Sequence, residues 1–484
     1  MSALGAATAS GVRWGAAAGA VTAALQLVQM AVLGRLLGPE PFGLMAMLLI
    51  VTGFVTILRD AGVPEYVVYR QRLDPPALAT LAWVNLGGGA LLAVLVWGAA
   101  PWIARGFDAP ELVAPARAVA VVFVIGALSA VSRAVLQVRL AFRPIAVADM
   151  AGTVVNLAVS VAFAMLVRAD VWALAWGFLA AAAVRTAFLV GAARGAGAFP
   201  GLAFQPAEVA GFARFGAYRV GATVLNYLRA RVDQLLVGIL FGPQWLGFYS
   251  MASNLVLQPS QQVNTVLAGV AFPVLSRVRD EPDRLRHGFL KLARLTAAVN
   301  APVMLGALAV APVALPLIFG ADWAPMTPLF MVLAMNALLR ALAGVGGSLL
   351  MAKGRADWVF RWNLGVMVAS PVVIGLAALS GSVLGVAVGL TLFQAVLVVA
   401  HQAVLTARLL GPVLPAVGRA VAAPTLCAAA MAAGVALLPL LPVPGPAPLL
   451  AAQLAAGVAL YAALCAAFAP DTLREARTLL RGRA

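Results

Sequence analysis

The sequence is poor in charge, with only 10% of its 484 residues being Asp, Glu, Lys or Arg. Soluble domains are usually about one quarter charged, so this composition excludes an ordinary soluble enzyme or binding domain. Hydrophobic residues make up 63% of the chain and the mean hydropathy is +0.99. The apolar surplus runs through the whole length and is interrupted only by short loops. This pattern predicts an all-α polytopic membrane protein.

Cysteine and histidine are nearly absent, with two residues of each. Cys427 and Cys465 lie inside apolar runs, where a thiol behaves as a small apolar group, so no disulfide framework is predicted. His287 and His401 are far apart in the sequence, which argues against a His/Cys metal site. We expect no cofactor, and the identity of any coupling cation stays open.

Motifs for nucleotide chemistry and for hydrolysis are also missing. GxxxxGK followed by Ser or Thr does not occur, and no Ser/His/Asp constellation stands out. The outer loops are short and hold few carboxylates, which disfavours a membrane-embedded glycan polymerase or ligase. The net charge of +16 comes from basic residues in loops between apolar runs, which argues against nucleic acid as a partner. We therefore expect a protein that is not an enzyme.

Apolar runs of about 20 residues, the length needed to cross a bilayer as a helix, predict about 14 transmembrane helices. The loops on one side of these helices share their excess of Arg and Lys with the basic tail that holds Arg474 and Arg477. The opposite loops hold few cations. The positive-inside rule then places both termini in the cytoplasm, with the helices in the bacterial inner membrane.

One turn is written twice. Residues 33–45 read LGRLLGPEPFGLM and residues 237–249 read VGILFGPQWLGFY, with glycines and a proline in the same register. Six predicted helices separate the copies, which predicts two parallel-repeat six-helix lobes around a central cavity, plus two C-terminal helices. The predicted domains are an N-terminal lobe, a C-terminal lobe, the two extra helices and a basic tail, at residues 1–205, 206–412, 413–470 and 471–484.

Mid-span charge is concentrated in the seventh predicted helix. Four polar residues recur there at helical spacing and share one face, namely Arg219, Asn226, Arg229 and Asp233, while Arg231 points elsewhere. Charges at this depth are costly unless they face water or a partner. We take all five as candidates for binding an anionic headgroup. The alternative is a local ion pair between Arg229 and Asp233.

The eighth predicted helix carries a stripe of amides. Asn254, Gln258 and Gln261 lie at helical spacing beside Pro259, which removes one helical hydrogen bond. Amides beside a kink suit sugar hydroxyls or a discontinuous transporter helix. They suit hydrogen bonds between neighbouring helices equally well.

Other charges are predicted near cytoplasmic ends of helices, where long side chains reach the membrane surface. They are Arg59, Asp60, Arg133, Asp149, Arg185 and Arg340. Between the eighth and ninth helices, Leu285, Phe289, Leu292 and Leu295 share one face among basic residues. This segment predicts an amphipathic helix on anionic lipid, with a solvated connector as the alternative.

With these segments identified, the chain resembles the Wzx-type oligosaccharide flippases, polysaccharide exporters of the multidrug/oligosaccharidyl-lipid/polysaccharide superfamily. The segments that carry the resemblance are RDAGVPEYVVYRQ, RLAFRPIAVADM, NYLRARVDQLLVGILFGPQWLGFYSMASNLV, AFPVLSRVRDEPDRLR and PLIFGADWAPMTPLF. Members of this family tend to carry Arg-Asn-x-Asp before the second copy of the turn. Asp233 matches that pattern, whereas Ala230 and Arg231 stand where Arg and Asn are usual.

The resemblance implies that the protein moves a polyprenyl-diphosphate-linked glycan between leaflets by alternating access. Membrane lipids, a glycan polymerase and glycosyltransferases would be its further partners. Arginines such as Arg229 and Arg231 would attract the diphosphate, and amides such as Gln258 would meet the sugars. A multidrug cation antiporter of the same superfamily is the alternative, and it would require an acidic cavity.

Overall fold

The computed structural model describes residues 3–60, 62–70, 74–195, 203–442 and 444–470, without the side chains of 3–17, 206–220, 222, 262–263 and 265–270. All regular structure in these ranges is helical. Within the described part of the chain, thirteen segments are long and apolar enough to cross a membrane. One of them, Thr223–Gln261, is divided by a backbone break at Gly242 into two halves, each about as long as one span. The predicted all-α, multi-pass architecture with about 14 helices is confirmed.

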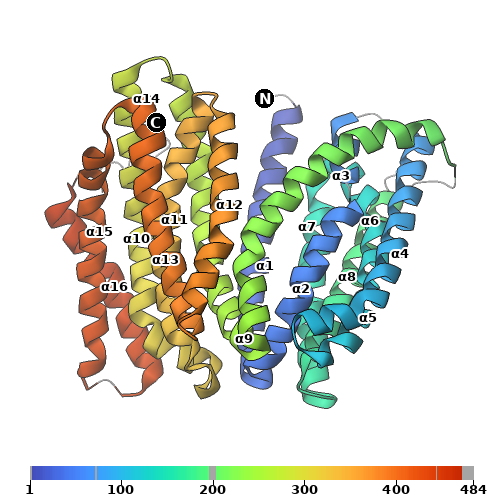
Figure 1. Cartoon of the computed structure of the whole chain (residues 1–484), viewed down its shortest axis with the longest axis horizontal. Helices are drawn as coiled ribbons and strands as arrows, with labels where there is room; N and C mark the ends of the chain where they lie inside the picture. The colour runs from blue at the N-terminus through green and yellow to red at the C-terminus, as the bar shows by residue number, and fades with distance from the viewer. Residues whose placement is uncertain (1–2, 61, 71–73, 196–202, 443, 471–484) are drawn as a thin grey trace. The chain divides into compact units, whose positions relative to one another are not determined.

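Contacts divide the chain into two units, Met1–Gly247 and Phe248–Ala484. In its described residues, the first unit contains helices α1 to α8 and the beginning of α9 (Figure 1). They are α1 (Ala3–Leu37), α2 (Pro39–Asp60), α3 (Val63–Arg70), α4 (Pro75–Gly106), α5 (Val113–Val119), α6 (Val122–Val138), α7 (Phe142–Leu166), α8 (Val171–Gly195) and α9 (Pro206–Arg277). Within the unit α1 packs on α7, α7 on α8, α8 on α6 and α6 on α4.

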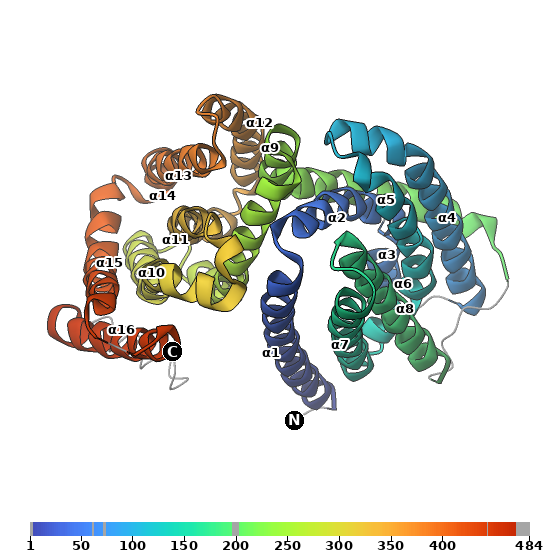
Figure 2. The same cartoon turned by 90° about the horizontal axis from the view of Figure 1, so that it is seen from below.

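The second unit holds the end of α9 and the remaining helices. They are α10 (Pro282–Phe319), α11 (Met326–Ala352), α12 (Ala356–Ala378), α13 (Val383–Ala400), α14 (Ala407–Leu410), α15 (Leu414–Leu437) and α16 (Pro446–Phe468). The last two helices lie beside α10, as Figure 2 shows, and Tyr461 of α16 donates a hydrogen bond to the carbonyl oxygen of Ala298 at 2.8 Å. The predicted lobe boundaries follow the repeat rather than these contacts, and they stay a prediction.

The repeated turn has the same backbone conformation in both copies. Gly38 separates α1 from α2 with φ of 71°, and Gly242 breaks α9 with φ of 79°. An L-residue other than glycine rarely adopts this left-handed conformation. The proline that follows each of these glycines starts the next helix, where its missing N–H leaves no hydrogen bond unmade.

The two copies also pack against each other through glycines. A Cβ atom added at Gly43 would overlap the carbonyl oxygen of Pro243, and one added at Gly247 would overlap that of Pro39. The contact is reciprocal, as expected when equivalent segments of a duplicated chain meet. Small residues permit this approach of backbone to backbone. The repeated glycines therefore have two roles. Gly38 and Gly242 form the turn, and Gly43 and Gly247 allow its two copies to contact each other.

The amphipathic segment is not a separate helix on lipid. It forms the first part of α10, and its predicted apolar face is buried, including Leu285 and Phe289 at 0% exposure. These side chains pack in one cluster with Leu275 of α9 and Leu349 of α11. The apolar face was predicted correctly, but it is covered by protein rather than by lipid or water.

Candidate functional site

The predicted headgroup residues of the seventh span lie in the first unit, on α9. Asn226 and Arg229 are exposed, whereas Arg231 and Asp233 are half-buried. The side chain of Arg219 lies outside the described residues. Each of these positions belongs to continuous helix. The common face predicted for Arg219, Asn226, Arg229 and Asp233 therefore follows from the observed backbone, and Arg231 lies off that face.

Two polar contacts within α9 involve Arg231 and Asp233. Arg231 donates a hydrogen bond from Nη1 to Oε1 of Gln234 at 2.8 Å, and the backbone N–H of Gln234 donates to Oδ1 of Asp233 at 2.8 Å. Gln234 itself is 4% exposed. Arg231 is thus anchored at one end of its guanidinium. Arg229 and Asp233 both make polar contacts, and their mutual pairing stays a prediction.

Tyr227 fixes how this part of α9 lies on α2. Its hydroxyl donates to the carbonyl oxygen of Ile50 at 2.8 Å and also lies 3.2 Å from that of Leu49. The ring occupies the space where a side chain at Gly53 would stand. Arg231 follows Tyr227 by one helical turn, so it lies toward α2, while Arg229 lies on another side of α9.

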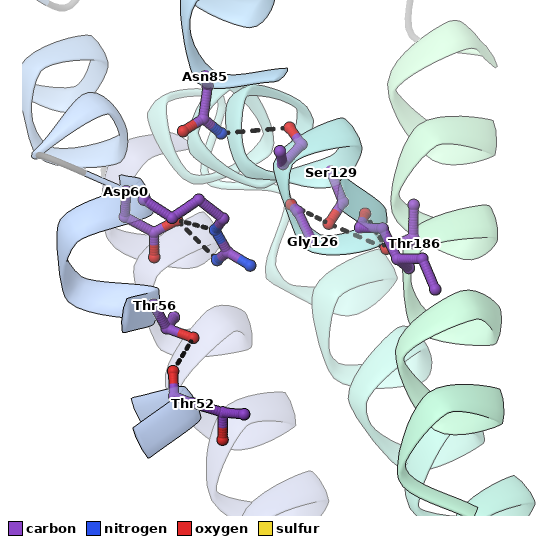
Figure 3. A network of polar contacts seen from close by, with 10 residues as sticks. Thr52, Thr56, Asp60, Asn85, Gly126, Ser129 and Thr186 are labelled. Carbon is purple, nitrogen blue, oxygen red and sulfur yellow. Dashed lines mark hydrogen bonds and ion pairs between the residues drawn. The ribbon is translucent and has the colours of Figure 1, made fainter. Parts of the chain in front are cut away.

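Arg59 and Asp60, at the end of α2, form an ion pair inside the first unit. Two guanidinium nitrogens of Arg59 donate to Oδ1 of Asp60, at 2.9 and 2.6 Å (Figure 3). The Arg59 side chain is only 10% exposed and lies over Gly126 of α6, where a Cβ atom would overlap it. This arginine turns inward rather than toward the membrane surface.

Neutral polar groups continue the network across α4, α6 and α8, as Figure 3 shows. Asn85 donates to the carbonyl oxygen of Ala127 at 3.2 Å, and Ser129 donates to that of Gly126 at 3.1 Å. Thr186 of α8 lies 3.1 Å from the Ser129 hydroxyl. These bonds join three helices inside the membrane-spanning part, where unpaired polar groups are costly.

A second set of charged residues connects the consecutive helices α6, α7 and α8. Arg133 of α6 donates to both carboxylate oxygens of Asp149 on α7, at 3.1 and 2.9 Å. Arg185 of α8 places Nε 3.2 Å from Oδ1 of the same carboxylate. All three side chains are between 32% and 41% exposed. We call Arg133, Asp149 and Arg185 the ion cluster.

Two arginines correct the sequence prediction that they lie near helix ends and reach for the surface. Arg185 lies near the middle of α8, and Arg340 near the middle of α11. Sequence reasoning named each residue but not their meeting. The one usable signal was that three neighbouring predicted helices each carry a charge of alternating sign.

In the second unit, the three predicted amides lie along α9. Asn254 and Gln258 are half-buried, and Gln261 is exposed. The helix continues through Pro259, and within the described backbone of α9 only Gly242 is non-helical. The amides are therefore presented by a continuous helix that contains Pro259, and the kink stays a prediction.

A small cavity of about 130 Å³, lined mainly by apolar groups with a few polar side chains, lies further along the same unit. Its polar lining residues come from three helices and are Asn264, Thr296, Arg340 and Ser348. Asn300, 1% exposed, donates to the carbonyl oxygen of Thr296 at 3.1 Å and lies 3.4 Å from Oδ1 of Asn264. Amides, hydroxyls and one guanidinium are the groups that bind sugar hydroxyls.

Among the described residues, no three His, Cys, Asp or Glu side chains gather as a metal site would require. Cys427 and Cys465 are buried in one apolar cluster and form no disulfide. The polar chemistry of the described chain therefore rests on arginines, a few carboxylates, amides and hydroxyls.

Known proteins resemble this chain in sequence and in fold. The family model described as polysaccharide biosynthesis protein matches residues 32–328. The lipopolysaccharide biosynthesis protein WzxC of Escherichia coli is 30% identical over 410 residues, covering 84% of this chain and 82% of that protein. The succinoglycan biosynthesis transport protein ExoT of Rhizobium meliloti is 25% identical, covering 81% and 78%.

Two solved structures share the fold at 13% sequence identity. The lipid II flippase MurJ, in an inward closed conformation, superposes with a TM-score of 0.76 over 95% of this chain and 99% of its own. An inward-facing multidrug resistance transporter of the MATE family gives a TM-score of 0.62 over 84% and 96%. Each likeness covers most of this chain and shows a shared fold.

Proposed function

Because this chain belongs to the polysaccharide biosynthesis protein family, we propose that it is a flippase for a lipid-linked polysaccharide precursor. The observation that carries the proposal is the combination of that membership with a flippase fold along nearly the whole chain. Relatives named for lipopolysaccharide biosynthesis and for succinoglycan transport support the same substrate class.

The finer substrate is a glycan linked to a polyprenyl diphosphate, carried between leaflets by alternating access. Arginines inside the membrane-spanning helices support an anionic headgroup, since they would bind phosphate by bidentate hydrogen bonds. The protein acts as a transporter rather than an enzyme, in the bacterial inner membrane with both termini in the cytoplasm. The excess of basic residues in one set of loops supports this orientation.

A multidrug antiporter is the second candidate, since a multidrug transporter shares the fold with a lower TM-score. Binding organic cations would call for unpaired carboxylates inside the membrane. Asp60 and Asp149 are both held by arginines instead. The charge of the interior thus favours an anionic cargo.

The test is a deletion strain complemented with the cloned gene. We expect the deletion to remove surface polysaccharide and to accumulate lipid-linked precursor in the cytoplasmic leaflet, with both restored by the gene. Precursor is measured by mass spectrometry of lipid extracts, and surface glycan by staining. Normal surface glycan together with raised sensitivity to cationic drugs would replace this function by the antiporter.

A further inference from the structure

The ion cluster carries more positive than negative charge. Arg133 uses two nitrogens on the two oxygens of Asp149, in the fork geometry that best neutralises a carboxylate. Arg185 then meets a carboxylate whose front edge is already occupied. One aspartate faces two arginines, and a net charge of one remains.

Arg185 is near Asp149 without being hydrogen-bonded to it through Nε. Its Nε lies 3.2 Å from Oδ1, yet this nitrogen is buried and has no hydrogen-bond partner among the described residues. The side chain as a whole is 41% exposed, so part of it is open to a ligand. A guanidinium presents five N–H donors, and the described contacts leave most of those of Arg185 available.

The surroundings hold the Arg185 guanidinium in place. Gly152, one turn after Asp149 on α7, leaves the room it needs, since a Cβ atom there would lie 3.3 and 3.4 Å from two of its nitrogens. Arg185 also lies near the middle of α8. A cationic side chain inside a membrane-spanning helix is costly unless it meets a partner, and an incoming anion would neutralise the positive charge that Asp149 leaves uncompensated.

We propose that the ion cluster is an anion-binding site of the first unit, at which Arg185, with Arg133 beside it, binds a phosphate or diphosphate group. Asp149 holds both guanidiniums in position until the anion arrives. This inference rests on the proposed function for the source of the anion, which is the diphosphate of the lipid-linked cargo. Inorganic pyrophosphate presents the same chemistry and is the second source to be tested.

Binding is measured on the full-length protein in phosphatidylcholine nanodiscs. The probes are undecaprenyl diphosphate, its uncharged counterpart undecaprenol, and inorganic pyrophosphate as competitor. We expect Arg185→Gln to weaken binding of the diphosphate lipid by about tenfold or more, which is the range for a hydrogen bond to a charged group, and to leave undecaprenol unchanged. Arg185→Lys keeps the charge but loses the fork, so its affinity is intermediate.

Arg194→Gln, in the last turn of the same helix, is the matched control and should bind both lipids like the wild type. Wild-type affinity of Arg185→Gln for the diphosphate lipid would overturn the site, as would equal loss of both lipids in a folded variant. If Arg185→Gln does not fold, binding of undecaprenyl diphosphate and of undecaprenol by Arg185→Lys decides instead.

The two hypotheses fail separately. If the wild type binds pyrophosphate through Arg185 but not undecaprenyl diphosphate, the anion site stands and the proposed cargo falls. If the lipid binds wild type and Arg185→Gln equally while export depends on the gene, the cargo stands and the anion site falls.

Discussion

The two copies of the repeat share their backbone and differ in their side-chain chemistry. At the repeated turn, Gly38 and Gly242 have the same left-handed conformation, and Gly43 and Gly247 make the same contact in reverse. Away from the turn, the first unit contains an ion cluster, whereas the second contains a cavity of amides and hydroxyls. The turn thus has the same positive φ in both copies, while the two units contain different polar groups.

Two arginines in the middle of helices, one in each unit, differ in their surroundings. Arg185 and Arg340 both lie near the middle of their helices. Arg185 stands 3.2 Å from a carboxylate, while Arg340 lines a cavity with neutral polar groups and has no acidic partner within ion-pair distance among the described residues. The first arrangement suits a phosphate-type anion, and the second suits hydroxyl groups.

The largest effect is expected where the copies are most alike. Gly43→Ala or Gly247→Ala places a methyl group against a backbone carbonyl, which cannot rotate away as a side chain can. We expect each change to cost about 1–3 kcal/mol or more through overpacking, seen as a lower melting temperature of the detergent-solubilised protein. Gly88→Ala on α4, which meets no atom within 4 Å, is the control. A wild-type melting temperature for both test variants would contradict the reciprocal contact.

The turn could be predicted because its determinants are local. Glycine, proline and the apolar runs around them fix a tight connection between two helices whatever else the chain does. The partner of the turn was not local, and only the structure shows that the copies meet. The same holds for Leu285 and Phe289, whose common face followed from helical spacing while the protein surface that covers them did not.

The ion cluster escaped prediction for a related reason. Arg133, Asp149 and Arg185 belong to three helices, and each one alone fits the rule that long charged side chains reach toward a membrane surface. Their meeting depends on how α6, α7 and α8 pack, which no single-helix pattern contains. The amide stripe around Gln258 was read correctly as helical, but its contacts remain predictions for the same reason.

The next prediction compares the two mid-span arginines directly. Arg185→Gln should lower export by about tenfold or more, because a charge-assisted contact to the cargo is lost. Arg340→Gln should lower export only a few-fold, because glutamine keeps hydrogen-bonding capacity among neutral groups. Surface-glycan staining per unit of membrane-inserted protein measures both. The reverse order would show that the charge difference between the units does not determine where the headgroup binds.

Replacing the arginines of α9 should lower export less, and the result should show whether each one binds the headgroup or only an aspartate. Arg229→Gln and Arg231→Gln should each reduce export several-fold if they attract the headgroup, with partial rescue by lysine. If Arg229 serves only to pair with Asp233, the double change Arg229→Gln, Asp233→Asn should restore export, because no unpaired charge is left behind. Precursor accumulation measured in the same cells distinguishes lost transport from lost synthesis. Normal export by both single variants would remove α9 from headgroup binding.

The smallest effect is expected at the uncharged polar groups near the cavity of the second unit. Asn300 is buried, and its Oδ1 has no hydrogen-bond partner among the described residues, although its amide nitrogen donates to Thr296. Asn300→Leu removes this unsatisfied acceptor, so we expect unchanged stability or a gain of about 1 kcal/mol. Asn300 also donates a 3.4 Å hydrogen bond to Oδ1 of Asn264, which lines the cavity. If the cavity receives sugar hydroxyls, loss of this support should nevertheless lower export by the same variant a few-fold.

Asn336→Leu is the matched control for that experiment. Asn336 lies on α11 and donates to the carbonyl oxygen of Leu390 at 3.3 Å; unlike the partners of Asn300, Leu390 does not line the cavity. Its replacement should lower stability by about 1 kcal/mol through a lost hydrogen bond and leave export per folded protein unchanged. We therefore expect Asn300→Leu to keep or raise the melting temperature and lower surface glycan, and Asn336→Leu to lower the melting temperature and leave surface glycan unchanged. Export by Asn300→Leu at the wild-type level would assign the cavity to packing, because an amide that served the cargo could not be replaced by leucine without loss.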